Sequence, residues 1–180
     1  ADGFTTSSTN YTFTNASSET YVAWNWYAGG SNATNTDGTI TSTVRADQDA
    51  GFSIVSYTGT GSAATVGHGL SSAPEMIIVK KRDDVRDWVV WNKSIYDLNS
   101  SNVLFLNATN AASSISNNFG TSPTTTTVFN VNTNQATNGS TNDHIAYCFH
   151  SVDGHSKFGS YTGNGSTDGP FVYTEIKVGW

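Results

Sequence analysis

A seven-residue segment occurs twice in this chain, and it constrains the organisation of the chain more than any other feature. Residues 56–62 read SYTGTGS and residues 160–166 read SYTGNGS, an offset of 104 residues. A second pattern, an aliphatic residue followed by Ala, an aromatic, any residue and an aromatic, also occurs twice, within 21–26 and 144–149. Two matches in the same order indicate duplicated β-modules, because the offset is the length of a small domain.

The spacing between the two motifs differs between the copies. It is 35 residues in the front copy (56 − 21) and 16 in the rear copy (160 − 144), so the front copy carries about 19 extra residues. We place them in 29–38 and the polar segment that follows. We predict three divisions. Residues 1–50 are the end of a preceding unit, or N-terminal strands with an inserted loop. Residues 51–153 are a complete β-module, and residues 154–180 are the start of a following unit packed on the same sandwich.

Apolar runs rich in β-branched and aromatic residues are separated by Gly, Asn and Ser clusters, and no window keeps a 3.6-residue period. This pattern predicts an all-β fold, an antiparallel β-sandwich with jelly-roll-like character and little or no helix. About eleven short strands are expected. They lie at 4–13, 21–27, 39–45, 51–58, 76–79, 88–91, 103–106, 124–131, 145–149, 157–161 and 171–178.

Two of these runs, 76–79 and 88–91, are continuously apolar, which is typical of central strands that are covered on both faces. Alternation in 21–27 places Val22, Trp24 and Trp26 on one face, which we expect to be buried. The predicted core residues are Trp24, Trp26, Ile77, Ile78, Trp88, Val90, Phe105 and Phe149. The predicted structural turns contain Gly59, Gly61, Gly163 and Gly165, with the second glycine of each pair at positive φ.

The composition excludes several classes of function. Charged residues are 12% of the chain and the net charge is −6 with eight Lys and Arg, so a phosphate-binding surface for nucleic acid is not expected. No run approaches the ~18 apolar residues of a membrane span, so no membrane insertion is predicted. The single Cys148 lies inside an apolar strand and is expected to be a small core residue.

Residues that could carry catalysis or bind a metal form no recognised motif. Three of the four histidines, His144, His150 and His155, are close in sequence, but their spacing matches no zinc site. The charges around residues 80–87 alternate in sign, which is typical of a solvated hairpin tip, and they lack a calcium-loop pattern. We therefore predict no enzyme activity, no catalytic residues, no metal and no cofactor.

Several motifs in fixed order resemble a domain that is repeated in large tail-fibre-like structural proteins of marine phages, especially cyanophages. They lie at 21–26, 29–30, 35–44, 51–62, 66–70, 73–80, 145–149 and 157–166. The resemblance implies a structural and host-attachment module on an extracellular virion. It also implies partners among other copies of the chain, other virion proteins and host cell-surface glycans, but it assigns no ligand-binding residue.

A second class of function is consistent with the same composition. Tyr, Trp and Asn on a rigid β scaffold suit sugar binding, because aromatic rings stack on pyranose rings and amides bond hydroxyl groups. A secreted or virion-associated carbohydrate-binding module or glycan depolymerase is therefore the alternative. For the structural module, we expect the edge strands at 4–13 and 171–178 to be the joints between copies, together with Trp180.

Overall fold

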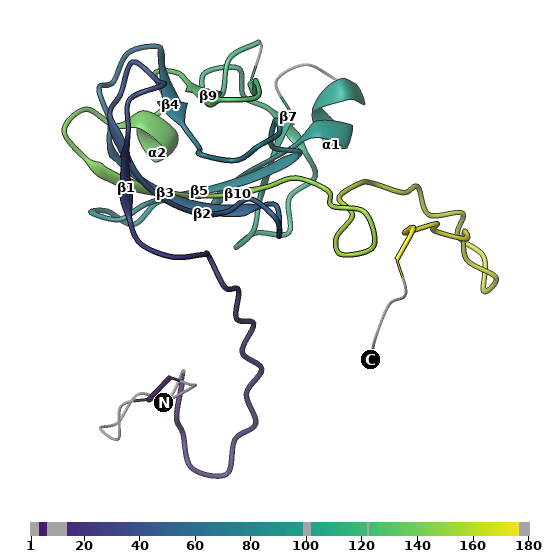
Figure 1. Cartoon of the computed structure of the whole chain (residues 1–180). Helices are drawn as coiled ribbons and strands as arrows, with labels where there is room; N and C mark the ends of the chain where they lie inside the picture. Colours follow the sequence, from purple (N-terminus) through teal and green to yellow (C-terminus); the bar gives the residue numbers. More distant parts are fainter. Residues whose placement is uncertain (1–3, 7–13, 99–101, 122, 177–180) are drawn as a thin grey trace.

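The computed structural model describes residues 4–6, 14–98, 102–121 and 123–176. Two antiparallel β-sheets pack face to face, with a larger sheet beneath a smaller one in Figure 1. Extended segments lead away from the sandwich at both ends of the chain (Figure 1). The predicted all-β sandwich is therefore confirmed, with ten strands in the described part and two short helices.

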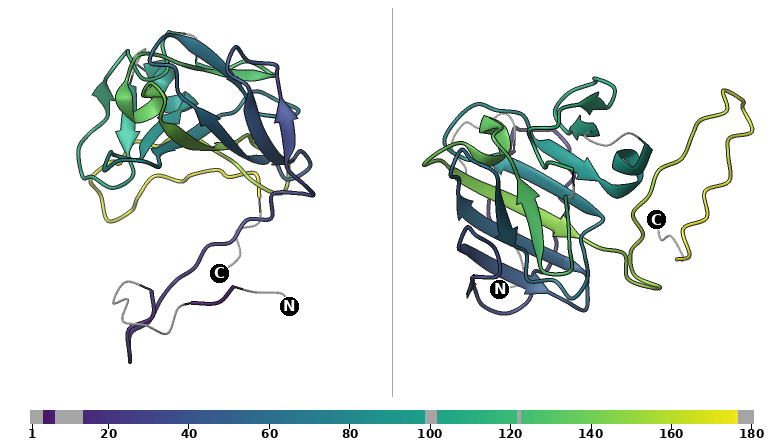
Figure 2. Two further views of the ribbon diagram at one scale, coloured as in Figure 1. Left: turned by 90° about the vertical axis from the view of Figure 1, so that its left-hand side faces the viewer. Right: turned by 90° about the horizontal axis from the view of Figure 1, so that it is seen from above.

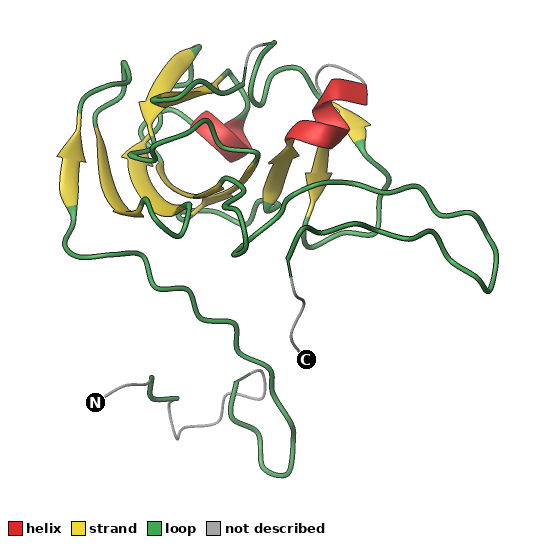
Figure 3. Ribbon diagram, turned by 45° about the vertical axis from the view of Figure 1, so that its right-hand side comes forward, coloured by secondary structure: helices red, strands yellow, loops and turns green. Residues whose placement is uncertain are grey.

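The larger sheet has eight strands in the order β1-β2-β3-β10-β5-β6-β7-β8. Their bounds are β1 Ala33–Asn35, β2 Ser42–Asp47, β3 Phe52–Thr58, β10 Asp143–Phe149, β5 Met76–Lys81, β6 Val89–Asn92, β7 Asn102–Phe105 and β8 Ser113–Ser114. The smaller sheet pairs β4 Ala64–Gly67 with β9 Val128–Val131. The helices are α1 Lys93–Leu98 and α2 Gln135–Asn138, each begun by an Asn side chain that accepts backbone N–H bonds. Figure 3 shows how little of the chain they occupy.

The last strand of the sandwich, β10, lies between β3 and β5 and pairs antiparallel with both. Along its length Ala146 is opposite Val55 on one side and Val79 on the other. This arrangement places β5 in the interior of the sheet, as its continuous apolar run predicted. The expected boundary at residue 51 falls between β2 and β3, which are neighbours in the same sheet. The extra front residues include the β1–β2 hairpin.

The main core lies between the two sheets and contains the inward-facing residues of both. Ile77, Val79 and Ala146 from the larger sheet have no exposed surface, and neither does Phe129 from the smaller one. The prediction that Ile77 is a core residue is thus confirmed. Phe105, also predicted to be a core residue, packs against this core while remaining partly exposed. The remaining members of this core are Ile40, Val44, Val55, Tyr57, Val66, Leu70, Val89, Trp91, Tyr96, Val103, Phe119, Val131, Ala136 and Cys148.

A second, smaller apolar cluster lies on the opposite, outer face of the larger sheet. Its buried members are Ala28, Phe52 and Phe149, with Ile54, Met76, Ile78, Tyr147 and Phe158 partly buried around them. Of the predicted core residues, Phe149 and Val90 are buried, whereas Ile78 and Trp88 are only half-buried. The second face of the central strands is therefore apolar but incompletely covered.

Trp24 and Trp26 were wrongly predicted to be core residues. Their exposed fractions are 78% and 58%. In the described structure, residues 21–27 are extended but form no strand, and they lead away from the sheet (Figure 1). Alternation correctly indicates that these side chains share a side, but it cannot show whether another element covers that side.

The other terminal strands were also wrongly predicted where the structure describes them. Residues 4–6, 157–161 and 171–176 form no strand. Residues 7–13 and 177–178 of the two predicted edge strands, and Trp180, lie outside the described residues. These segments have high β propensity, but a strand needs a partner for its backbone N–H and C=O groups.

The two copies of the seven-residue motif have the same local turn in different surroundings. Gly61 and Gly165 have φ of 73° and 68°, as predicted. The Ser62 N–H donates to Thr60 Oγ1 at 3.4 Å, and the Ser166 N–H donates to Asn164 Oδ1 at 3.0 Å. Thus the one substitution within the motif keeps its internal hydrogen bond.

Hydrogen bonds tie the front turn to the rest of the sandwich. The Thr60 N–H donates to Asn138 Oδ1 at 2.8 Å, and the Gly61 N–H donates to the Asn138 carbonyl at 2.8 Å. The Asn138 amide in turn donates to the carbonyls of Ser62 and Asn132. Residues 159–173, which include the rear turn, are all exposed. The rear copy therefore lacks the surface against which the front copy packs.

We expect Gly59→Ala to destabilise the sandwich and Gly163→Ala to leave it unchanged. A Cβ at Gly59 would clash with the carbonyl oxygen of Gly139, whereas a Cβ at Gly163 meets nothing within 4 Å. The cost at Gly59 should be about 1–3 kcal/mol in urea unfolding. Equal midpoints for the two variants would contradict the different surroundings of the two turns.

Adjacent isoleucines test the difference between the two faces of β5. Ile77→Ala should lower the free energy of unfolding by about 2–5 kcal/mol, because it opens a cavity in a closed core. Ile78→Ala should cost less than about 2 kcal/mol, because Ile78 is already partly hydrated. Chemical denaturation of both variants at a concentration where the chain is monomeric measures the difference, and similar losses would refute it.

Candidate functional site

The outer face of the larger sheet contains an apolar hollow of about 360 Å³. We call it the aromatic hollow; it is lined by Trp24, Trp26, Phe52, Ile54, Ile78, Trp88, Leu106, Tyr147 and Phe149. Phe52 and Phe149 form its floor, with ring centroids 4.8 Å apart and planes inclined by 30°. Trp88 and Tyr147 stack beside them at 6.4 Å. No lining residue carries a formal charge.

Strand register brings most of these side chains together from three neighbouring strands, β3, β10 and β5, and Trp88 immediately precedes β6. Phe52 is opposite Phe149, Ile54 is opposite Tyr147, and Ile78 is opposite both Tyr147 and Val90. Paired residues project on the same side of a sheet, so these side chains form one apolar patch on the outer face. From the sequence we expected Ile78, Trp88 and Phe149 to be buried, with no role at the surface. The signal was present in β5, whose outward residues are as apolar as its inward ones.

Both terminal segments start at the aromatic hollow. The Trp26 ring lies 6.3 Å from the rings of Phe52 and Phe149. From the other end of the chain, Phe158 lies 5.4 Å from Phe149. Each segment therefore has aromatic residues at the sheet, Trp24 and Trp26 at one end and Phe158 at the other, and then continues into solvent.

Large apolar side chains continue to be exposed along these segments. Phe171 is 90% exposed and Tyr161 is 71% exposed. The other exposed large apolar residues of the two segments are Phe4, Tyr21, Val22, Trp24, Trp26, Tyr27, Val172 and Tyr173. Single exposed apolar residues are ordinary, but contiguous apolar patches mark interaction surfaces.

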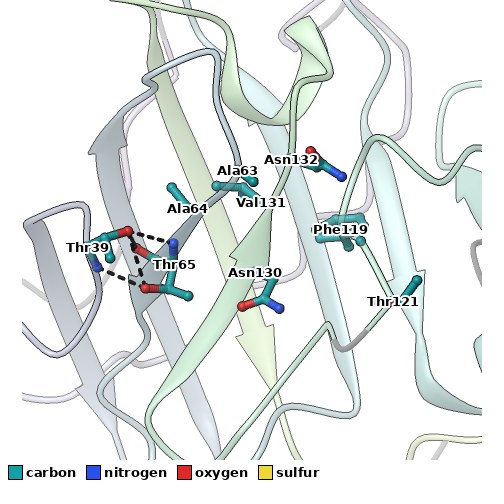
Figure 4. A pocket seen from close by; sticks show the side chains of 10 residues that line it. Thr39, Ala63, Ala64, Thr65, Phe119, Thr121, Asn130, Val131 and Asn132 are labelled. Atoms are coloured by element: carbon teal, nitrogen blue, oxygen red, sulfur yellow. Dashed lines mark hydrogen bonds between the residues drawn. The ribbon is translucent and has the colours of Figure 1, made fainter.

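A second, polar groove of about 400 Å³ crosses the smaller sheet (Figure 4). Thr39, Thr65, Asn130, Asn132 and Phe119 line it together with Ala63, Ala64, Gly120, Thr121 and Val131. No sequence pattern predicted this groove, because its small polar residues follow no recognisable spacing.

The polar groups of the groove are largely engaged within the protein. The Thr39 N–H donates to Thr65 Oγ1 and the Thr65 N–H donates to Thr39 Oγ1, each at 2.9 Å (Figure 4). The Asn132 amide donates to the Ser116 carbonyl at 3.5 Å. Phe119 is buried and offers no exposed ring for stacking. The groove therefore suits a weakly held neutral ligand better than a tightly recognised one.

The histidines do not converge. His144 is buried in the core, where its ring stacks on Tyr57 at 5.2 Å, and His68 is buried between backbone groups. His150 is buried beyond β10 and His155 is exposed. Among the described residues, no group of three or more His, Cys, Asp or Glu side chains could hold a metal ion.

The remaining titratable candidates have structural surroundings. The tip after β5 is solvated as expected, with Asp84 3.3 Å from Lys81 Nζ and 3.2 Å from Arg86 Nε. Cys148 is fully buried, and burial raises the pKa of its thiol to about 12. A thiol in this state is a poor nucleophile. No helix in the described part of the chain is long and apolar enough to cross a bilayer.

The fold and these surfaces define a β-sandwich module with one sheet face closed by a second sheet and the other face aromatic and open. The chain belongs to a family described as a domain of unknown function (DUF7483), whose model matches residues 1–180. No curated protein and no solved structure matches the chain.

Acid should destabilise the sandwich through His144 and His68. Burial lowers the pKa of both imidazoles below the ordinary value of 6.5. For His144, nearby Lys81 lowers the pKa further, while carbonyls of Gln135 and Asn142 and the Asp83 carboxylate raise it. For His68, the carbonyl of Thr125 and the carboxylate of Asp37 raise the pKa, and His150 lowers it.

The direction of this pH dependence follows from the neutral form of His144 that the fold requires. His144 Nε2 accepts the Gly139 N–H at 3.3 Å, so a proton there would oppose that donor. Stability should be complete above pH 6.5 and fall as the pH drops toward the lower folded-state pKa. Urea unfolding at pH 7.5, 6 and 5 measures this loss, and His144→Gln should reduce the slope. Stability that rises with acid over this range would contradict it.

Proposed function

We propose that this chain is a structural and adhesive module of a virion appendage, with no catalytic role. Its packing surface is the aromatic hollow together with the exposed aromatics of the two terminal segments. Its partners are other copies of the chain and other virion proteins, and host-surface glycans are a further contact. The observation that carries the proposal is the open apolar face of the larger sheet.

The energetic argument is that so much apolar surface favours association. Burying one Phe, Leu or Ile side chain contributes about 1.5–3 kcal/mol, and several such side chains surround the hollow. The lining of the hollow carries no formal charge that would need to be desolvated or paired. Few charges elsewhere give little repulsion between copies. The setting on a phage virion is supported by the motif resemblance alone.

Carbohydrate binding is the second candidate, and one observation favours it. Trp24 and Trp26 present exposed rings beside the aromatic hollow, and exposed rings can stack on sugars. The hollow itself lacks the ring of amide and hydroxyl groups that normally fixes a sugar, since its lining is apolar apart from the Tyr147 hydroxyl and indole N–H groups. Those polar groups lie instead in the groove across the other sheet.

Light scattering over a range of concentrations tests the proposal. We expect the chain to self-associate, and we expect association to persist when NaCl is raised from about 0.05 to 0.5 M, because burial of apolar surface is not screened by salt. Replacing both exposed tryptophans (Trp24→Ser, Trp26→Ser) should weaken association at least about tenfold.

The matched control is Val85→Ser, which removes a 97% exposed apolar residue from the β5–β6 connection, away from the hollow. It should associate like the unmodified chain. A chain that stays monomeric at high concentration, and whose tryptophan fluorescence is instead quenched by neutral oligosaccharides, would overturn the structural proposal in favour of carbohydrate binding.

A further inference from the structure

We propose that residues 21–26 of one copy and 156–162 of another form an antiparallel strand pair that reproduces the β10–β3 pair of the sandwich. This inference rests on the proposed assembly and specifies its joint. The partner at the aromatic hollow is thus a second copy of this chain, which contributes a terminal strand to a two-stranded ribbon. The aromatic side of that ribbon covers the hollow.

The sequence repeats identify which strands the terminal segments resemble. Residues 21–26 match 144–149, which lie within β10, and 156–162 match 52–58, which are β3. β10 and β3 are neighbours, paired antiparallel over seven residues from each strand. The two ends of the chain therefore carry copies of two strands that already recognise each other within the sandwich.

The β10–β3 register gives the register of the proposed ribbon. Ala146 is opposite Val55 and Tyr147 is opposite Ile54. Replacing each of these residues by its counterpart in the terminal segments places Ala23 opposite Gly159 and Trp24 opposite Phe158. Because side chains alternate across a strand, one side of the ribbon carries Val22, Trp24, Trp26 and Phe158.

The substitutions between the copies change the character of both sides of the ribbon. On the side that the sandwich buries in its core, Cys148 is replaced by Asn25, Val55 by Gly159 and Ser53 by Lys157. That side is therefore polar or small at these three positions, although Tyr161 keeps the aromatic ring of Tyr57 and Tyr21 stands in place of His144.

On the opposite side three positions are aromatic in the terminal copies, whereas Phe52 is replaced by Ser156. Tyr147 is replaced by Trp24, Ile54 by Phe158 and Phe149 by Trp26. The side with Val22, Trp24, Trp26 and Phe158 is the more apolar of the two, so it is suited to lie on an apolar sheet face, and the aromatic hollow is such a face.

Neither segment is part of a sheet, although Ser156 at the start of the rear segment forms an isolated bridge with Val152. In the described part of the chain, 21–27 and 156–162 belong to no strand. Trp24 and Tyr161 are largely exposed, whereas Tyr57, the counterpart of Tyr161, is buried and donates its hydroxyl to the Thr137 carbonyl. The turn that follows the rear segment already has the backbone of its front counterpart, with Gly165 at positive φ.

The two segments leave the sandwich in different directions, the N-terminal one below the larger sheet and the C-terminal one beyond its side (Figures 1 and 2). Each can therefore meet its complement from a neighbouring copy. A two-stranded ribbon is marginal alone in water, so the pair should form only where the aromatic hollow supports it.

Cysteine cross-linking between separately made chains tests both the pair and its register. One chain carries Ala23→Cys and the other Gly159→Cys; a Cβ at Gly159 meets nothing within 4 Å, and Ala23 is exposed. Directly opposite residues of an antiparallel pair are about 4.5–5.5 Å apart at Cα, which suits a disulfide. The native Cys148 is buried and should not compete. Mild oxidation of the mixture should give a covalent heterodimer.

The register control pairs Ala23→Cys with Ser160→Cys, which lies one residue further and projects to the other side of the strand. We expect about tenfold less heterodimer from this mixture. Equal yields from both mixtures would overturn the register. A mixture without heterodimer, in which a chain carrying both Ala23→Cys and Gly159→Cys closes on itself, would overturn pairing between copies.

Failure of this inference is distinguishable from failure of the proposed assembly. If the unmodified chain associates in light scattering but the mixture gives no heterodimer, the assembly stands and this joint is wrong. If the unmodified chain remains monomeric, both are wrong. Heterodimer formed in register supports both.

Discussion

The structure depends on the insertion of β10 between β3 and β5. This non-local pairing joins residues 52–58 to 143–149 and closes the centre of the larger sheet. It also fixes both faces at once, because Ala146 and Cys148 project inward with no exposed surface while Tyr147 and Phe149 project outward. Non-local strand pairs carry a large loop-closure cost, which the buried inner face must offset.

The two faces of the larger sheet differ in how they are completed. The inner face is covered by β4 and β9, whose Val66, Phe129 and Val131 are almost fully buried. The outer face has comparable apolar character but only a few residues from the chain ends near it, such as Trp26 and Phe158. A sheet that is apolar on both faces is typical of three-layer packing, and within the described residues the third layer is incomplete.

The sequence predicted the fold class and the central position of β5 because continuous apolar runs depend on burial alone. It failed at 21–27 and 157–161 because propensity and alternation describe a segment, whereas a strand also needs a partner. Trp24 shows the limit most clearly, since its face was identified correctly and its cover was not. The polar groove was missed because Thr39, Thr65 and Asn130 come together only through the packing of β4 and β9.

The wrong strand predictions at 21–27 and 157–161 have a common physical basis. A segment that copies β3 without the inward Val55 cannot be stabilised by a core, because Gly159 buries nothing in its place. What remains is backbone hydrogen-bonding capacity and an aromatic side, and both are satisfied by another strand lying on an apolar face. Such a joint adds about 1 kcal/mol per backbone bond and more per buried ring, so it forms only when all its parts are present together. Assembly would then be cooperative, with isolated modules folded but unpaired at their ends.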